Sequence, residues 1–348
     1  MSQILTNKYG LPKTLADAVA LDTHRVGGDI SVTQLIDGPR IRILKGKHDY
    51  ESDVVDNLYA LMGTALHNIL ERANIKSVRK RAFILTAETI ITEADRLAKD
   101  TTNPDAVKRA AQLKAAANYI FSLIPVFFPE IGSRYIFELT LRLEVGDIVL
   151  YGTFDVYDQE TGILYDYKFT SVYAWTYPES RKKWERQTNI YATMLINTKG
   201  LSVNGIRIVA FFRDWNEYSL NRSKDYPQRQ IMEIDVPVYS EERVMTYINA
   251  RLDIHRRAMA GEDIDCTGDE RWGKATMYAV KTPKSKKAVR VFDSEPASIA
   301  FLQENQHKYD NAFIEKRPGD SMRCAKYCSV APFCSQRKKE LEMQALEK

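Results

Sequence analysis

The stretch that decides the fold is residues 138–168, ELTLRLEVGDIVLYGTFDVYDQETGILYDYK, in which three strand patterns are separated by two short turns. Apolar and polar residues alternate over 135–144, and residues 148–155 and 163–168 are rich in β-branched and aromatic side chains. Gly146 and Asp147 are turn residues, and residues 158–162 turn the chain again. The pattern predicts three strands joined by two hairpins at the centre of the protein.

Acidic residues occupy positions in these strands where apolar residues are usual. Asp166 and Lys168 lie two residues apart, so they share one face of the third strand. Asp155, near the end of the neighbouring strand, can converge on them. Two carboxylates beside a lysine suit a hard divalent cation and the phosphate that it would hold. The alternative interpretation of this Asp-x-Lys pattern is a buried ion pair at a sheet edge.

The bulk composition fits a globular protein without declaring a partner. The chain has 348 residues and is 44% hydrophobic, enough for one large domain or two ordinary ones. Its 50 basic and 46 acidic residues give a net charge of +4, which does not by itself indicate a nucleic-acid binder. No apolar run approaches the length of a membrane span, and no signal-peptide pattern opens the chain. We expect a soluble protein of the cytoplasm, in a bacterium or a phage-infected host.

A helix over about residues 53–72 carries a histidine beside its apolar stripe. Gly63, His67 and Glu71 recur at intervals of four residues, so they share a face next to that stripe. His67 is thus either a functional group that looks out from a packed helix or a hydrogen-bonded structural histidine. The predicted core stripe consists of Leu58, Met62, Ala65, Leu66 and Ile69.

Other segments read as helices and strands around the centre. Helices are predicted over 86–101, 104–124, 178–197, 240–260, 295–312 and 336–347, with Asn103 as the cap of the second. Strands are predicted over 206–212 and 231–236. Arg40 belongs to a small basic patch that follows a turn at residues 37–40.

Basic residues gather in two places that could guide a nucleic-acid strand by charge, with aromatic residues nearby for stacking. Gln187 and Tyr191 lie one turn apart on the first of these segments, the helix that begins at Pro178. The second is a flexible loop over residues 281–287. The loop is alternatively an ordinary solvated face. The candidate DNA contacts are Arg181, Lys182, Lys183, Arg186, Lys284, Lys286 and Lys287.

All four cysteines lie in the last quarter of the chain, as Cys266 and the group Cys324-x3-Cys328-x5-Cys334. In a cytosolic protein this grouping favours a metal over disulfides. Four thiolates suit a tetrahedral zinc ion or a [4Fe–4S] cluster, and ligation by thiolates alone favours the cluster. Either metal would staple the C-terminal tail to the segment near Cys266. The remaining alternative is a set of reduced, partly buried cysteines.

Four motifs in chain order carry a resemblance to a known family: Gly63-Thr64-Ala65-Leu66-His67, Gly152-Thr153-Phe154-Asp155, Asp166-Tyr167-Lys168 and Gln187-x3-Tyr191. The ordered set resembles the PD-(D/E)xK nuclease superfamily, and within it the RecB-like exonuclease branch, over roughly residues 30 to 335. The cysteine group is similar to the iron–sulfur members found among helicase-nucleases, CRISPR-adaptation nucleases and phage recombination exonucleases. Two departures stand out: Gly38 occupies the place of a cysteine before a proline, and the Cys324–Cys328 spacing is x3 where x2 is common.

The resemblance implies a fold and a site. The fold is α/β, a central mixed sheet flanked by helices with a restriction-endonuclease-like core, a helical N-terminal part and a cysteine-stapled C-terminal region. Lys168 is the catalytic lysine, Gln187 and Tyr191 hold the DNA strand, and Glu138 is an accessory acid. The ligands implied for Mg²⁺ or Mn²⁺ are His67, Asp155, Asp166 and the backbone carbonyl of Tyr167.

We therefore expect a metal-dependent DNA exonuclease that processes single strands or duplex ends in recombination or repair. A single-strand annealing protein or a helicase is the implied protein partner. A flap or branched-DNA endonuclease, and a non-catalytic DNA-binding subunit that kept the fold, are the alternatives. The expected divisions are residues 1–130 for the helical part with His67, 131–260 for the nuclease core and 261–348 for the basic and cysteine-rich region.

Overall fold

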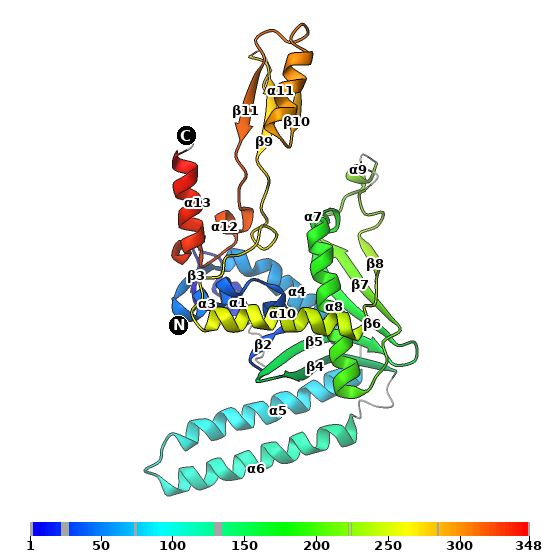
Figure 1. Cartoon of the computed structure of the whole chain (residues 1–348). Helices are drawn as coiled ribbons and strands as arrows, with labels where there is room; N and C mark the ends of the chain where they lie inside the picture. Colours follow the sequence, from blue (N-terminus) through cyan, green and yellow to red (C-terminus); the bar gives the residue numbers. More distant parts are fainter. Residues whose placement is uncertain are drawn as a thin grey trace. The chain divides into compact units, whose positions relative to one another are not determined.

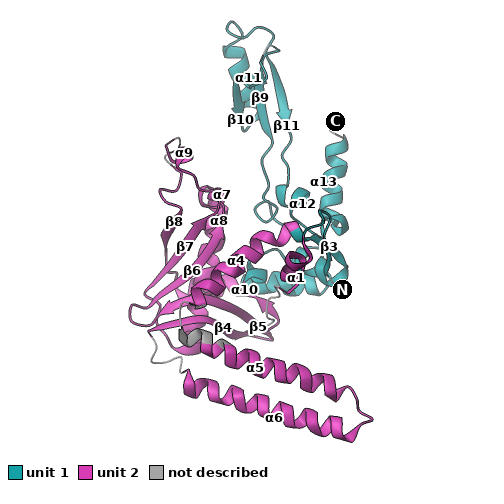
Figure 2. Ribbon diagram, turned by 180° about the vertical axis from the view of Figure 1, so that it is seen from behind, with its two compact units in different colours: residues 1–11, 33–54, 249–348 teal, residues 12–32, 55–248 magenta. Residues whose placement is uncertain are grey.

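The three predicted strands are successive neighbours in a six-stranded mixed sheet in the computed structural model (Figure 1). The structure describes residues 3–21, 28–72, 75–128, 134–221, 223, 225–283 and 285–346. The chain divides into two compact units, which Figure 2 colours separately. Unit 1 comprises Met1–Leu11, Thr33–Val54 and Asn249–Lys348, and unit 2 comprises Pro12–Val32 and Val55–Ile248.

The sheet of unit 2 combines antiparallel and parallel pairs. Its strand order is β2-β5-β6-β7-β8, and β4 pairs with β5 outside this path. The β6–β7 and β2–β5 pairs are parallel, and the others are antiparallel. Flanking helices complete the predicted α/β architecture, which is confirmed. The strands are β2 (Ile30–Ser31), β4 (Tyr135–Val145), β5 (Ile148–Asp158), β6 (Ile163–Thr170), β7 (Gly205–Phe212) and β8 (Ile231–Val236).

The turn between β4 and β5 is as tight as the sequence predicts. Val145 pairs with Ile148, which leaves a loop of only Gly146 and Asp147. Gly146 has a φ of +65°, a left-handed conformation that glycine adopts without steric cost and that a two-residue hairpin needs. The turn fixes the register along the two long strands, and so it decides which β4 residue lies opposite Asp155.

One edge of β5 opens in the middle. Leu150 and Tyr151 pair with β2, and Val156 to Asp158 pair with β6. Between these two ladders, residues 152–155 have no ladder partner on that edge among the described strands. The β5 and β6 strands are therefore paired at Val156–Asp158 and unpaired on the N-terminal side of Val156, where Asp155 lies.

Helix α8 (Pro178–Lys199) supplies much of the core beside the sheet. It follows the short helix α7 (Val172–Thr176), and it contacts β4, β5, β6 and β7. Its residues from Thr188 to Leu195 are all buried. Large apolar side chains from the strands complete the core, because the strand faces and this helix exclude water together. The most deeply buried large side chains of this unit are Ile30, Leu141, Leu150, Phe154, Leu164, Ile190, Met194, Leu195, Ile206, Ile208 and Phe212.

The remaining helices of unit 2 include a long helical pair, α5 (Ile75–Ala98) and α6 (Pro104–Phe127), which lie side by side in Figure 1. Small side chains are almost completely buried in this pair, namely Ala87, Ala94, Ala110 and Ala117. Asn103 caps α6 as predicted, accepting hydrogen bonds from two backbone N–H groups. Unit 2 also contains α1 (Lys13–Leu21), α9 (Glu217–Leu220), most of α4 (Val54–Arg72) and the start of α10 (Glu241–Met259).

The predicted core stripe of α4 is wrong. Met62 is 50% exposed and Ile69 is 63% exposed. Leu58 and Leu66 are only partly covered. The apolar period correctly predicts a helix, but no described element covers the whole stripe.

Unit 1 is assembled from three segments that are far apart in the sequence. Strands β1 (Gln3–Thr6) and β3 (Tyr50–Asp53) form a parallel pair. Strands β9 (Met277–Lys281), β10 (Arg290–Phe292) and β11 (Phe313–Arg317) form an antiparallel sheet, in the order β10-β9-β11. The predicted helix over 295–312 ends earlier, and β11 was not predicted. The helices are α2 (Val32–Ile36), α3 (Pro39–Lys47), α11 (Glu295–Glu304), α12 (Met322–Lys326), η1 (Ala331–Phe333) and α13 (Ser335–Leu346).

Membrane-spanning helices are absent from the part of the chain that the structure describes, since no helix there is both long and apolar enough.

Candidate functional site

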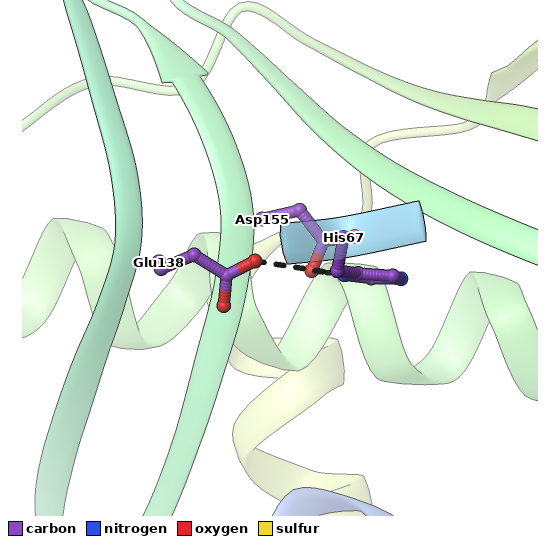
Figure 3. Close-up of side chains that lie close together, drawn as sticks. All are labelled: His67, Glu138 and Asp155. Carbon is purple, nitrogen blue, oxygen red and sulfur yellow. Dashed lines mark ion pairs between the residues drawn. The ribbon is translucent and has the colours of Figure 1, made fainter. Parts of the chain in front are cut away.

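Three predicted site residues meet in unit 2 although they come from different elements. His67 belongs to α4, Glu138 to β4 and Asp155 to β5, and together we call them the His67 cluster (Figure 3). The Nδ1 atom of His67 lies 3.5 Å from Oε1 of Glu138 and 3.3 Å from Oδ1 of Asp155. One ligand atom from each residue lies within 4.8 Å of the others, a spacing that suits a single metal ion. The cluster is partly buried, so an ion here would be shielded from bulk water.

Glu138 is held in an unusual backbone conformation at this point. Its φ is +47°, although it lies within a strand. Phe137 pairs with Val156 and Leu139 pairs with Phe154, so Glu138 and Asp155 lie opposite each other but do not pair. A left-handed conformation costs a residue with a side chain about 1 kcal/mol or more. Such strain often accompanies functional sites, and here it occurs where the two carboxylates face His67.

A chain of polar contacts leads from Asp166 to Tyr191. The Nζ atom of Lys168 lies 2.7 Å from Oδ2 of Asp166 and donates a hydrogen bond of 3.0 Å to Oε1 of Gln187. Gln187 donates in turn to the hydroxyl oxygen of Tyr191 at 2.9 Å. Gln187 therefore fixes the position of the Lys168 ammonium group, and Tyr191 fixes the position of Gln187. Tyr191 is buried, and its burial raises the pKa of its hydroxyl group.

The open edge of β5 brings Asp155 to the backbone of β6. Oδ2 of Asp155 accepts a hydrogen bond of 2.5 Å from the backbone N–H of Tyr167. In a strand, the N–H and C=O groups of one residue point to the same side, so the Tyr167 carbonyl also points toward β5. The predicted carbonyl ligand thus lies on the same side as Asp155.

The electrostatics of the site favour positive charge. Burial lowers the pKa of His67, but hydrogen bonds to Asp155 and Glu138 outweigh it and raise the pKa to about 10. Burial raises the pKa of Glu138. Burial also raises the pKa of Asp166, and the Lys168 ammonium group partly offsets this rise. These carboxyl groups are ionised at a cost, which a cation among them would reduce.

The predicted DNA-contacting residues are spread over both units. On α8, the guanidinium of Arg181 lies over the ring of Trp175, and that of Arg186 lies over Tyr247. Lys182 forms an ion pair with Glu179 at 2.5 Å. Lys183, on the same helix, is half-buried. In unit 1, Lys286 and Lys287 are exposed, and Lys284 lies outside the described residues.

The four cysteines come together in unit 1, where they line one cavity. Burial raises the pKa of Cys266 to about 12, with contributions from Glu270 and Cys334. Burial and the neighbouring Cys328 raise the pKa of Cys324. Burial thus disfavours the ionisation of Cys266 and Cys324, a cost that a bound metal would offset.

Sequence analysis missed the buried charges around this cavity. Arg40, which the sequence placed in a small basic patch, is only 6% exposed. Its guanidinium pairs with Asp263 at 2.7 Å and Asp265 at 2.6 Å, and it donates to the carbonyl of Ile264 and the hydroxyl of Ser335. The signal was the acidic run just before Cys266, which suits an arginine partner. Arg40 thus joins α3 to the segments on either side of the cysteines.

Comparison with known proteins identifies a family by its sequence pattern. The sequence pattern of the PD-(D/E)XK nuclease superfamily matches residues 42–335. Among solved structures, the crystal structure of SSO0001 is similar at 12% sequence identity and a TM-score of 0.32, over 70% of this chain and 84% of that one. A search of curated proteins finds no match. The matched pattern covers most of the sequence and contains every residue of the His67 cluster, and on this ground the chain belongs to the PD-(D/E)XK nuclease superfamily.

Proposed function

We propose that the protein is a metal-dependent DNA exonuclease that processes single strands or duplex ends. The observation that carries the proposal is the meeting of His67, Glu138 and Asp155 beside the Asp166–Lys168 pair, in a chain of a nuclease superfamily. An imidazole, several carboxylates and an ammonium group in one place can bind a divalent cation and a phosphate together.

The residues of the site fit Mg²⁺ or Mn²⁺. Oxygen donors predominate, with His67 as the nitrogen donor, and this set suits either ion. Oδ2 of Asp166 is buried, and its partner in the described part of the chain is the Lys168 ammonium group, 2.7 Å away. Burial raises the pKa of this carboxyl group, so a second cation beside it would stabilise its ionised form. The proposed ligands are His67, Asp155, Asp166 and the Tyr167 carbonyl, with Glu138 as an accessory acid.

When bound, a divalent cation supplies Lewis acidity to a phosphate oxygen and lowers the pKa of a coordinated water molecule. The protein's own groups then do the positioning. Lys168 places a positive charge beside Asp166, where it can stabilise charge that develops on the phosphate. Gln187 fixes the position of the lysine Nζ through a 3.0 Å hydrogen bond. Tyr191 fixes Gln187, and its buried ring excludes water from behind.

The test is cleavage of linear DNA by wild type, Asp166→Asn and Lys168→Met, with Mg²⁺ or Mn²⁺ and with EDTA. The wild type is expected to degrade linear strands from their ends, and each variant to lose on the order of 100-fold or more in rate, since each removes a group from the site. Both variants should still bind DNA. Undiminished cleavage by Asp166→Asn would contradict the proposal. Equal cleavage of circular and linear DNA would replace the exonuclease by an endonuclease.

We also propose that Cys266, Cys324, Cys328 and Cys334 hold a [4Fe–4S] cluster. The four cysteines line one cavity of unit 1, which supports a shared metal site. Four thiolates suit either a tetrahedral zinc ion or a [4Fe–4S] cluster, and ligation by thiolates alone favours the cluster.

Anaerobic purification followed by metal and sulfide analysis tests this second proposal. A brown protein with about four iron and four sulfide per chain, the content of one cluster, is expected. Replacement of Cys328 by serine should remove the colour. A colourless protein that contains zinc would contradict it.

A further inference from the structure

A pocket lies beside the first turns of α8, within unit 2. It is lined by Trp175 and Thr176 from α7, Arg181 from α8, Tyr226 and Pro227 from the loop before β8, and Met232 from β8. Neither the metal site nor the cysteine cavity includes any of these residues. Two aromatic rings surround this space together with Arg181, a candidate DNA contact from the sequence, and the chemistry proposed at the metal site does not use it.

The two aromatic rings that line the pocket are held in place by neighbouring residues. The indole N–H of Trp175 donates a hydrogen bond of 3.2 Å to the backbone carbonyl of Asp225, and the indole ring packs edge-on against Phe212. The hydroxyl of Tyr226 accepts a hydrogen bond of 3.0 Å from the backbone N–H of Asn216. Both rings thus keep their orientation without a ligand, which lowers the entropic cost of stacking a planar group against them.

Arg181 gives the pocket its charge. Its guanidinium lies 5.2 Å from the centroid of the Trp175 ring. Its Nε atom is buried, and no hydrogen-bond acceptor for it is found in the described residues. A guanidinium that stacks on an indole and keeps a free donor is suited to a planar ligand with acceptor atoms and a nearby negative charge. A nucleobase attached to its phosphate has these properties.

The position of the pocket agrees with such a ligand. Arg181 and Gln187 lie on the same helix, six residues apart, which corresponds to about 9 Å along the helix axis. Gln187 holds Lys168 at the metal site. About 9 Å is the length of two or three stacked nucleotides. Arg181 and Gln187 also point about 120° apart around the helix, so a strand whose phosphate lies at Lys168 reaches the pocket with a base at least two or three nucleotides away.

We propose that this pocket binds one unpaired nucleobase of the substrate strand, by stacking on Trp175 and Tyr226 and by contact with Arg181. The inference rests on the proposed function, because it takes the metal site as the place of the scissile phosphate. It assigns a single strand as the form of DNA that reaches the site, since a base within a duplex is not free to enter.

The experiment measures the binding of a short fluorescent single strand to the full chain by anisotropy, in EDTA so that no cleavage occurs. Trp175→Ala is expected to weaken binding by about 5- to 150-fold, the usual loss for one stacked base. The salt dependence of binding should not change, since no charge is removed. Tyr119→Ala on α6, where the ring is 66% exposed, is the matched control and should bind as the wild type does.

Abasic substitution identifies the base. Strands that lack one base at successive positions are compared, and one position is expected to weaken binding to the wild type but not to Trp175→Ala. Affinity of Trp175→Ala equal to that of the wild type, or an abasic loss that persists unchanged in Trp175→Ala, overturns the proposal. If Trp175→Ala does not fold, Tyr226→Ala on the other wall serves the same comparison. Free deoxyadenosine monophosphate is expected to compete only weakly with the strand. Displacement of the strand by micromolar concentrations of this nucleotide would overturn the proposal that the pocket's ligand is a DNA strand.

The outcomes for the pocket and for the nuclease are separable. If Trp175→Ala weakens strand binding in EDTA but the wild type never cleaves DNA with metal, the proposed function alone is contradicted. Normal metal-dependent cleavage, with no effect of Trp175→Ala on binding, would contradict the pocket alone.

Discussion

Gly152→Ala should damage the site without touching any ligand. A Cβ atom at this buried position would lie 2.5 Å from Cε1 of Tyr191 and 2.8 Å from Cγ2 of Val32. Ordinary carbon contacts begin near 3.4 Å, so the tyrosine ring must move by about 1 Å. Tyr191 accepts from Gln187, and Gln187 accepts from Lys168, so the displacement reaches the ammonium group. A misplacement of about 1 Å costs on the order of 100-fold in rate, and overpacking costs about 1–3 kcal/mol in stability.

The assay compares the cleavage rate and the free energy of unfolding of Gly152→Ala with those of wild type. Gly46→Ala in α3 is the control, because its added Cβ meets no heavy atom within 4 Å. That variant should cleave at the wild-type rate. Combining Gly152→Ala with Tyr191→Ala should cost less stability than the sum of the two changes, since the smaller side chain removes the clash. A Gly152→Ala protein that cleaves as fast as wild type would refute the idea that Tyr191 positions Lys168.

The contacts described above support three more predictions. Glu138→Gly should slow cleavage but raise the free energy of unfolding by about 1 kcal/mol, because glycine relieves the left-handed backbone strain. Glu138→Gln should slow cleavage without that gain in stability. A Glu138→Gly protein less stable than the wild type would contradict the argument. Arg40→Leu should destabilise unit 1 by about 2 kcal/mol in denaturant, because it leaves Asp263, Asp265 and the Ile264 carbonyl without their partner. Lys47→Leu, which removes an exposed positive charge from the same helix, is the control. Equal unfolding midpoints for the two variants would refute the argument. Burial and Arg251 lower the pKa of His255 to about 4, so between about pH 6.5 and pH 4 the unfolded chain binds a proton that the folded chain does not. The free energy of unfolding is therefore highest above about pH 6.5 and falls by up to roughly 3 kcal/mol as the pH drops. His255→Leu should flatten this part of the curve of unfolding free energy against pH.

Local sequence pattern predicted the elements that are organised by their own periodicity. Helix α8 begins at Pro178 as expected, and Asn103 caps α6. The hairpin at Gly146 followed from turn chemistry alone. In each case the determining interactions lie within a few residues along the chain, so a single sequence contains them.

The failures occurred where the outcome depends on what packs against an element. Met62 and Ile69 keep the helical period of a buried stripe, but no described segment covers them fully. Strand β11 has the polar sequence FIEKR and owes its form to backbone pairing with β9, which no local pattern reveals. The left-handed backbone of Glu138 likewise depends on a partner in another strand.

The candidate site divides in the same way. The residue types and their order pointed to His67, Asp155, Asp166 and Lys168, and the structure places them on neighbouring elements of unit 2. The roles of these residues stay predictions that the cleavage assays test. The acidic run before Cys266 suits an arginine partner, but only the fold shows that this partner is Arg40. The Trp175 pocket likewise depends on segments that lie apart in the sequence.

Unit 1 has a consequence for the protein while it is still on the ribosome. Residues 33–54 leave the exit tunnel long before their partners from residue 249 onward exist, since residues 55–248 of unit 2 separate them. At about 5–20 residues per second, this gap lasts roughly 10–40 s. The sheet that carries Asp155 and Asp166 can thus form first, while residues 33–54 of unit 1 still lack the later segment against which they fold. Nascent chains halted before Cys266 should therefore resist protease over the sheet and be cut within residues 33–54.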